Sequence, residues 1–134
     1  MIVVDYKPEH FHYLRLQPMQ QLIGDEYCID PKGTSYSMFD GDNVVACAGI
    51  MRVDYRTSML WALLSITAGR HMVAIFRAAR RIVDLHTGEL LAMVREDFDQ
   101  GHRMVNMLGF RRIPGSMIKT GSPPLPCALY RRCC

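Results

Sequence analysis

The chain has 134 residues, of which 49% are hydrophobic and 22% are charged, and its net charge is +3. This length fits one domain, and the composition is typical of a soluble globular protein rather than a disordered one. The charge is too small for a nucleic-acid-binding protein, in which a dense basic stripe is expected. No apolar run reaches the roughly 20 residues of a membrane span, and the first residues lack the pattern of a secretory signal. We therefore expect a cytoplasmic protein without nucleic-acid or membrane partners.

The first quarter of the chain predicts a short strand, two short helices and a loop. Residues 2–4 form a β-branched run that is typical of a strand. Pro8 suits the first turn of a helix, and Phe11 lies on the apolar face of that helix. A second short helix is expected over residues 19–23, and residues 29–33 have the composition of a loop.

The next segment predicts a hairpin followed by a buried strand. Residues 36–39 and 44–53 are the two strands, joined by a turn that contains Gly41. The second strand is small or apolar at successive positions, so both of its faces should be covered. Residues 54–57 form another turn, and the apolar run 59–64 has the length of a central strand rather than a helix.

The clearest helix is expected over residues 72–86, and it ends near Gly88. Its apolar face carries side chains at helical spacing: Met72, Ile75, Phe76, Ala79, Ile82, Val83 and His86. The opposite face is basic and is expected to be solvated. A strand follows over residues 89–94.

The last third of the chain predicts a short helix and closing strands. Asp97 followed by Gln100 has the spacing of a capping box, so the helix is expected over residues 97–108. Extended segments should follow at residues 110–113 and 127–131. The predicted fold class is a single α+β domain with a mixed, mostly antiparallel sheet flanked by helices, spanning residues 1–134.

The five cysteines predict neither disulfides nor a metal site. Their number is odd, and none forms a Cys-x-x-Cys pair with the usual zinc-binding spacing. His10 and His12 are two positions apart, so on a helix their side chains point in different directions. We expect reduced thiols and no bound metal.

The order of elements and several short segments resemble the GNAT acetyltransferase superfamily. The chain also resembles small acetyltransferase-like proteins of tailed phages and prophages. The segments that carry the resemblance are residues 8–10, 14–18, 45–49, 61–65, 101–103 and 107–110, the last of which has the frequent Leu-Gly-Phe ending. The resemblance implies that residues 60–65 are the splayed central strand and that residues 66–71 are the loop that holds the pyrophosphate of acyl-coenzyme A.

The resemblance also implies which residues would bind acetyl-CoA. They are Leu64, Ser65, Ile66, Gly69, Arg70, His71 and Met72. Backbone N–H groups at a helix N-terminus favour a pyrophosphate, and Arg70 would add charge. Of the family's loop pattern, however, Gly69 alone is present: Ile66 stands at the Gln or Arg position and His71 at the last Gly or Ala.

The catalytic groups are less well marked. Many members of the superfamily have a Tyr four residues before the Gly of the Gly-Phe ending, as general acid, and that position here is Val105. A general base should be a carboxylate or a His near the amine. Asp54 and Glu96 are the candidates, and Asp97 is a third that suits a helix cap better.

Two functions remain open from the sequence. In the first, a chain with degenerate catalytic positions binds and modulates a host bacterial protein. In the second, the chain is an active acyl-CoA-dependent N-acetyltransferase of a host protein or small amine. A structural role in a virion is a third alternative, and self-association into a homodimer is compatible with the sequence.

Overall fold

The computed structural model describes residues 1–16, 33–120 and 125–133. The helix expected over residues 19–23 and most of the loop expected over residues 29–33 lie outside the described residues. The described elements are β1 (Ile2–Asp5), α1 (Pro8–His12), β2 (Gly33–Asp40), β3 (Asn43–Arg52), β4 (Ser58–Leu64), the 3₁₀ helix η3 (Ala68–His71), α2 (Met72–Leu85), β5 (Leu90–Arg95), α3 (Asp99–Met107), β6 (Arg111–Thr120) and β7 (Leu125–Arg132).

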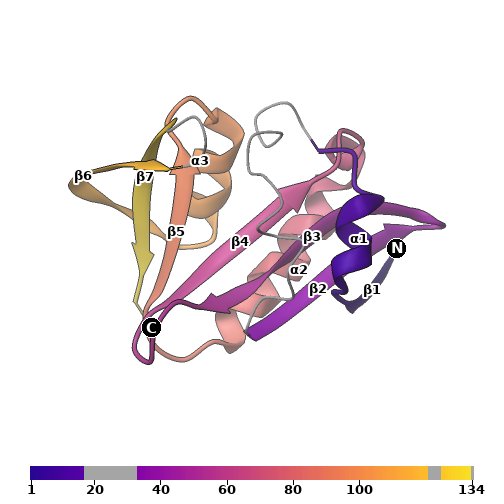
Figure 1. Cartoon of the computed structure of the whole chain (residues 1–134), viewed down its shortest axis with the longest axis horizontal. Helices are drawn as coiled ribbons and strands as arrows, with labels where there is room; N and C mark the ends of the chain where they lie inside the picture. Colours follow the sequence, from indigo (N-terminus) through magenta and orange to yellow (C-terminus); the bar gives the residue numbers. More distant parts are fainter. Residues whose placement is uncertain (17–32, 121–124, 134) are drawn as a thin grey trace.

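The strands form one seven-stranded sheet in the order β1-β2-β3-β4-β5-β7-β6 (Figure 1). Every neighbouring pair is antiparallel except β4 and β5, which are parallel. The expected α+β fold with a mixed, mostly antiparallel sheet is therefore confirmed. The parallel pairing is short, because it joins Ser58, Met59 and Leu60 of β4 to the start of β5 and goes no further. Beyond Leu60 the two strands separate, and the sheet is open between them.

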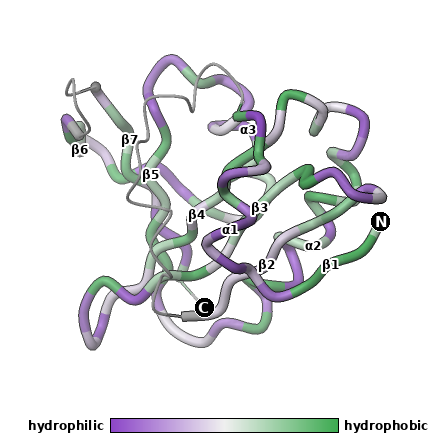
Figure 2. Tube along the Cα trace, turned by 45° about the vertical axis from the view of Figure 1, so that its right-hand side comes forward, coloured by the Kyte–Doolittle hydropathy of each residue, from purple (hydrophilic) through white to green (hydrophobic). Residues whose placement is uncertain are grey.

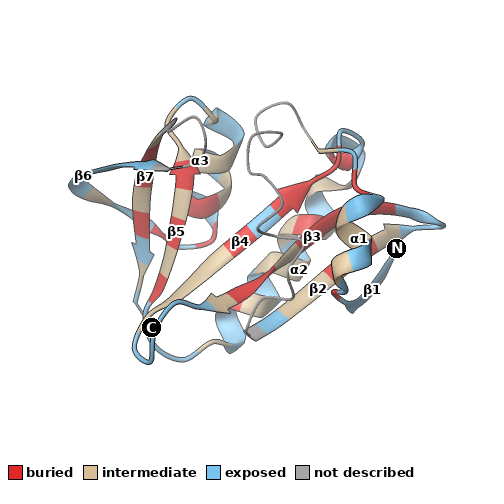
Figure 3. Ribbon diagram, viewed as in Figure 1, coloured by how far each residue is buried: buried red, intermediate tan, exposed pale blue. Residues whose placement is uncertain are grey.

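Helices cover both faces of the sheet, and β4 contributes side chains to each face because its residues alternate. Trp61 and Leu63 pack with Tyr6, Leu14 and the partly buried Phe11 on the side of α1. On the other side, Leu64 packs with Ile75 of α2 in one cluster, and Leu60 lies against a second cluster that includes Val83 of α2 and Val105 of α3. Figure 3 shows the long buried stretches of β3 and β4 between these layers.

The sequence predicts most of these elements correctly. The hairpin β2–β3, the central strand β4 and the helix α2 all lie within a few residues of their expected positions. Strand β3 is buried at most positions on both faces, as expected. None of the described helices has the length and apolar composition needed to cross a membrane.

Three local expectations need correction. The loop expected over residues 66–71 ends in the 3₁₀ helix η3. Strand β6 extends to Thr120, well beyond the expected segment. Asp97 does not cap α3, because its carboxylate is bound by Arg95 at 2.7 Å and the N-cap residue is Phe98. The ion pair takes up the side chain that the capping box needs.

Candidate functional site

The candidate site lies where β4 ends and α2 begins. The Ser65 amide donates to the carbonyl of Val45 on β3 at 2.9 Å. The Ser65 hydroxyl accepts the amide of Thr67 at 3.2 Å and lies 3.0 Å from the Thr67 hydroxyl. These short-range bonds form the turn that leads into η3 and α2. Ser65 is buried and supports the turn, so its own side chain is not presented to a ligand.

Gly69 and Arg70 form the accessible part of this turn. A Cβ added at Gly69 would meet no atom within 4 Å, so open space lies above its backbone. Arg70 is exposed and takes part in no ion pair among the described residues. Amides at the start of a helix and a free guanidinium both favour a negatively charged ligand. This part of the turn therefore suits a negatively charged ligand.

His71 gives the same turn a different character. Its Nε2 lies 3.3 Å from Oδ2 of Asp40, which is the last residue of β2. The side chain of His71 is about one-fifth exposed, whereas that of Asp40 is more than half exposed. The pair therefore places a carboxylate beside the N-terminus of α2. A negative charge there competes with a phosphate for the same helix end.

The backbone of Ile66 is hydrogen-bonded to a segment near the N-terminus. Its amide donates to the carbonyl of Arg15 at 2.7 Å, and Leu16 forms an isolated bridge with Ser65. Because the Ser65 amide points to β3, the next amide points to the opposite edge of β4, which is the edge that faces the gap toward β5. The segment 15–16 thus occupies the end of this open edge. The side chain of Ile66 is 55% exposed.

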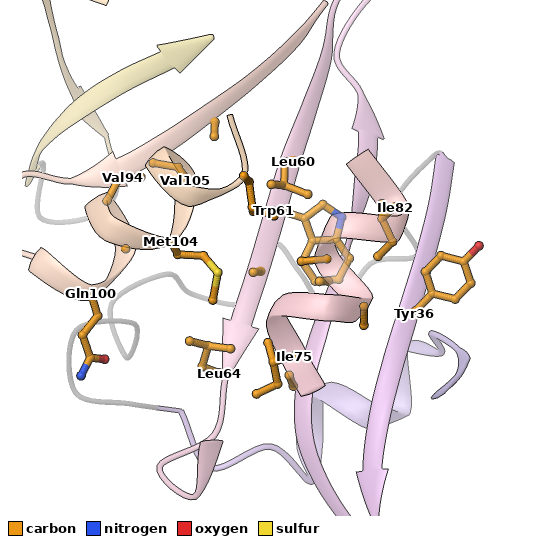
Figure 4. A pocket seen from close by; sticks show the side chains of 18 of the residues that line it. Tyr36, Leu60, Trp61, Leu64, Ile75, Ile82, Val94, Gln100, Met104 and Val105 are labelled. Carbon is orange, nitrogen blue, oxygen red and sulfur yellow. The ribbon is translucent and has the colours of Figure 1, made fainter. Parts of the chain in front are cut away.

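A cavity of about 490 Å³ opens between the separated strands β4 and β5 and the helices α2 and α3. Figure 4 shows Leu60 and Leu64 of β4 between Met104 of α3 and Ile75 of α2. The cavity is lined mainly by apolar side chains, and its volume is in the usual range for small-molecule sites. Such a cavity suits an apolar group better than a charged one.

The structure brings the predicted binding residues only partly together around this cavity. Leu64 and Met72 line it, whereas Ser65, Ile66, Gly69, Arg70 and His71 form the turn beside it and are not among its lining residues. The predicted site therefore divides into an apolar chamber and a polar turn at its end.

The predicted catalytic carboxylates lie outside the cavity. Asp54 is in the turn between β3 and β4, at the opposite end of β4 from the loop. Its Oδ1 accepts the amides of Arg56 and Thr57, each at 2.8 Å. These bonds lower the pKa of Asp54, because they stabilise the charged form. A carboxylate with a lowered pKa is a weaker base.

Glu96 follows β5, and both of its carboxylate oxygens accept from Nη2 of Arg112, at 3.0 and 2.8 Å. The carbonyl of Glu96 also lies 3.0 Å from Nε2 of His102. The position is closer to the open end of the sheet than that of Asp54, since the C-terminal ends of the parallel strands β4 and β5 point the same way. The carboxylate is nevertheless committed to a structural ion pair.

Val105 occupies the expected general-acid position and is an ordinary core residue. It is 6% exposed, packs with Leu108 and Phe110, and lines the cavity. Its isopropyl group has no proton to donate. Among the described residues, no group of three or more His, Cys, Asp and Glu side chains is arranged to hold a metal ion.

The sequence interpretation missed two alanines that shape the cavity. Ala48 of β3 and Ala62 of β4 are direct cross-strand partners in the middle of the sheet, and both line the cavity. Ala62 is exposed and Ala48 is half-buried, whereas Trp61 and Leu63 beside Ala62 are buried. The available signal was one small side chain within a run of large apolar side chains, which indicates space beside the strand. The run 59–64 contains one such position.

The fold belongs to a known class of protein. No family model and no curated protein sequence matches the chain. Solved structures do match, and they are GNAT acetyltransferases, so the chain has the GNAT fold. One is the IAA acetyltransferase from Bacillus cereus ATCC 14579, with a TM-score of 0.67, 11% identity, and coverage of 98% of this chain and 97% of that one.

A second similar structure is an N-acetyltransferase from Staphylococcus aureus Mu50, with a TM-score of 0.64 and 12% identity over 98% of this chain and 96% of that one. At such low identity the similarity establishes the arrangement of helices and strands. GNAT acetyltransferases use acetyl-CoA.

Proposed function

We propose that this chain uses the GNAT fold to bind a protein partner and lacks the groups for efficient acetyl transfer. One observation carries the proposal. Among the described residues that line the cavity, none is Asp, Glu or His. Acetyl transfer to an amine requires a proton to leave the amine, and those are the side chains that accept one near neutral pH.

The titratable groups that do line the cavity cannot replace a base. Burial raises the pKa of the Cys127 thiol, which keeps it neutral. Tyr36 lies on β2, far along the sheet from the loop, and the guanidinium groups of Arg81 and Arg95 have no site that accepts a proton. Positioning alone still lowers a barrier, so slow transfer is compatible with this site.

The proposed partner is a host bacterial protein. This part of the proposal rests on the resemblance to small acetyltransferase-like proteins of tailed phages, for which we expect a partner among the proteins of the infected cell. The edge strand β1 offers a suitable surface. Figure 2 shows it as a continuous hydrophobic segment, and Ile2 and Val3 are 63% and 48% exposed. An exposed apolar edge strand can pair with another chain.

Active acetyl transfer is the second candidate, and Gly69 favours it. The backbone there is open, Arg70 takes part in no ion pair with another described residue, and the cavity begins beside it at Leu64 and Met72. These residues fit the two ends of acetyl-CoA, with phosphates at the turn and the acyl-bearing arm in the chamber. Bound acetyl-CoA would supply the acetyl thioester, and this chain would supply orientation.

A thiol-release assay with acetyl-CoA and a panel of amines and peptides tests the proposal. We expect no release above the rate of the Gly69→Glu variant, which blocks the turn with a bulky anion. Release that depends on Gly69 would establish the enzyme instead.

Capture of a partner tests the binding role. Tagged protein is incubated with bacterial lysate, together with two matched variants, Ile2→Lys on β1 and Val53→Lys at the far turn, where Val53 is 55% exposed. We expect a defined protein that Ile2→Lys loses and Val53→Lys retains. Equal capture by both variants would remove β1 from the proposal, and no reproducible capture would overturn it. Recovery of the chain within phage particles would favour the virion role.

A further inference from the structure

The cavity contains a slot between α2 and the sheet that the acetyl-transfer reaction does not account for. Its sheet side is formed at the centre by the cross-strand pair Ala48 and Ala62. On the same face, the next pairs along these strands are larger: Ile50 with Leu60, and Ala46 with Leu64. The side chains on this face are therefore shorter in the middle of β3 and β4 than toward either end of these strands, which leaves a depression in the surface of the sheet.

Helix α2 does not fill this depression. It contributes Ala78 and Ala79 to the lining of the same cavity. Larger side chains hold the helix at both ends, since Ile75 packs with Leu64 near the loop and Val83 packs with Ile50 at the other end. Protein interiors are normally close-packed, so alanines on both walls between larger residues leave a real hollow.

The slot runs across the strands rather than along one of them. Lining residues continue from Val94 of β5 over β4 and β3 to Tyr36 of β2, at the far side of the sheet. The two paired spacings from β2 to β4 give about 10 Å, and the gap from β4 to β5 is at least one further spacing, so the length is at least about 14 Å. A saturated chain of roughly ten to twelve carbons has that extended length, given carbon–carbon bonds of about 1.5 Å in a zigzag.

The chemistry of the slot is that of an aliphatic ligand with one polar end. The lining along β3 and β4 is apolar. Two polar side chains, Arg95 at the end of β5 and the exposed Gln100 of α3, lie at the α3 end of the lining, and the other polar lining residues are Arg81 on α2 and Tyr36 and Ser37 on β2. An apolar ligand in such a cavity removes apolar surface from water, which favours its binding. The few polar groups at one end would orient it.

We propose that this slot binds a medium-length linear acyl chain, of about ten to twelve carbons, with its carboxyl or thioester end at the α3 mouth. The proposal adds a ligand class to the protein-binding role and stands whether or not acetyl transfer occurs. A free fatty acid and an acyl-CoA thioester share the same chain. The experiment separates these two sources.

The chain carries its own reporter, because Trp61 is the one tryptophan in the sequence and is among the lining residues. Its side chain packs on the α1 side of β4, one strand thickness from the slot, which is close enough for a bromine atom in the slot to quench it. Titration with 12-bromododecanoic acid should quench its fluorescence saturably, and unlabelled dodecanoate should reverse the quenching. Affinity measured calorimetrically should rise about fourfold per added methylene from octanoate to dodecanoate. No saturable quenching, or affinity independent of chain length, would overturn the proposal.

Variants locate the ligand. Ala62→Leu and Ala48→Leu fill the slot and should each weaken dodecanoate binding at least tenfold. Val73→Leu is the control, because Val73 is on the same helix as Ala78 but is 67% exposed and outside the lining. Circular dichroism and thermal melts verify folding. Folded slot variants that bind as well as Val73→Leu would show adsorption elsewhere and overturn the proposal. Should neither slot variant fold, the chain-length series decides.

Dodecanoyl-CoA separates the sources. Equal affinity for dodecanoate and dodecanoyl-CoA supports a slot that recognises the chain alone. Tighter binding of the thioester that Gly69→Glu removes supports the slot and shows that the turn holds coenzyme A. That second result would count against a binding-only role while leaving the slot intact. Failure of both ligands to bind overturns the proposal.

Discussion

The two faces of β4 differ in how completely they are packed. Toward α1, Trp61 and Leu63 are 4% and 0% exposed and belong to one dense cluster. Toward α2 and α3, Ala62 borders a cavity of about 490 Å³. Successive residues of β4 therefore face two differently packed layers. One face anchors the domain, and the other keeps space for a ligand.

The α1 face also has a chain of polar groups that runs from the exposed Lys7 amide to the buried Cys47 thiol. The Lys7 amide donates to Nδ1 of His10, so this nitrogen is an acceptor, and the Ser37 hydroxyl 2.7 Å away is its second donor. Cys47 Sγ lies 3.4 Å from the Ser37 hydroxyl and donates to it. This chain links α1 to β2 and β3 through satisfied hydrogen bonds, which fix one arrangement.

The largest expected effect compares the two faces directly. Leu63→Ala removes a fully buried side chain and should lower the free energy of unfolding by about 3 kcal/mol. Ala62→Leu, one residue away, adds volume to a hollow and should change it by less than about 1 kcal/mol. Urea denaturation measures both. A cost of Ala62→Leu as large as that of Leu63→Ala would mean that both faces are equally packed.

The next effect is a loss of stability in alkali that originates in Cys47. Burial raises the pKa of its thiol to about 11. In the unfolded chain the thiol has its ordinary pKa of about 9.0, so the unfolded state loses its proton first. The free energy of unfolding should therefore fall as pH rises above about 9, by roughly 1.4 kcal/mol at pH 10, and the fall should end above pH 11.

Stability measured against pH in wild type and Cys47→Ala checks this expectation. The variant should lose stability less steeply between about pH 9 and 10, because it has no buried thiol to ionise. Iodoacetamide should label the exposed Cys133 in the folded protein and spare Cys47. Rapid labelling of Cys47 in folded protein would contradict the burial.

A smaller effect concerns two serines on the same strand. Ser37→Ala leaves Cys47 without its acceptor and should cost about 1 kcal/mol. Ser35→Ala is the matched control: the Ser35 hydroxyl oxygen is buried and has no hydrogen-bond partner among the described residues, so its removal should be neutral or stabilising. Equal costs for the two variants in urea denaturation would show that the network adds nothing.

These contrasts explain what could be predicted from the sequence. Strand β4 and helix α2 were predictable, because a short apolar run and a 3.6-residue period are local signals. The slot was not, because Ala48 and Ala62 are fourteen residues apart and become partners only through the register of β3 with β4.

The site was predicted in outline and altered in detail by long-range contacts. The position of the turn follows from Gly69 and the resemblance to GNAT proteins. The ion pair of His71 with Asp40 and the bond from Ile66 to Arg15 join segments that are distant in sequence. The same holds for Glu96, whose partner Arg112 lies on β6. Local patterns cannot show which charges will meet.

The smallest expected effect tests whether the ion pair at the turn weakens anion binding. Asp40→Asn removes the carboxylate beside the N-terminus of α2 and should strengthen binding of coenzyme A at the turn by about two- to fivefold at low salt, since one charge is worth about 1 kcal/mol or less near water. Asp42→Asn is the control, because Asp42 is exposed in the same hairpin and has no ion-pair partner among the described residues. Shifts of the Gly69 amide signal in an NMR titration measure weak binding at this position. The gain should shrink in 0.5 M salt, where screening is strong. An equal gain from Asp42→Asn would assign the effect to the overall charge of the protein. The Asp40 carboxylate would then not compete specifically with an anion at the turn.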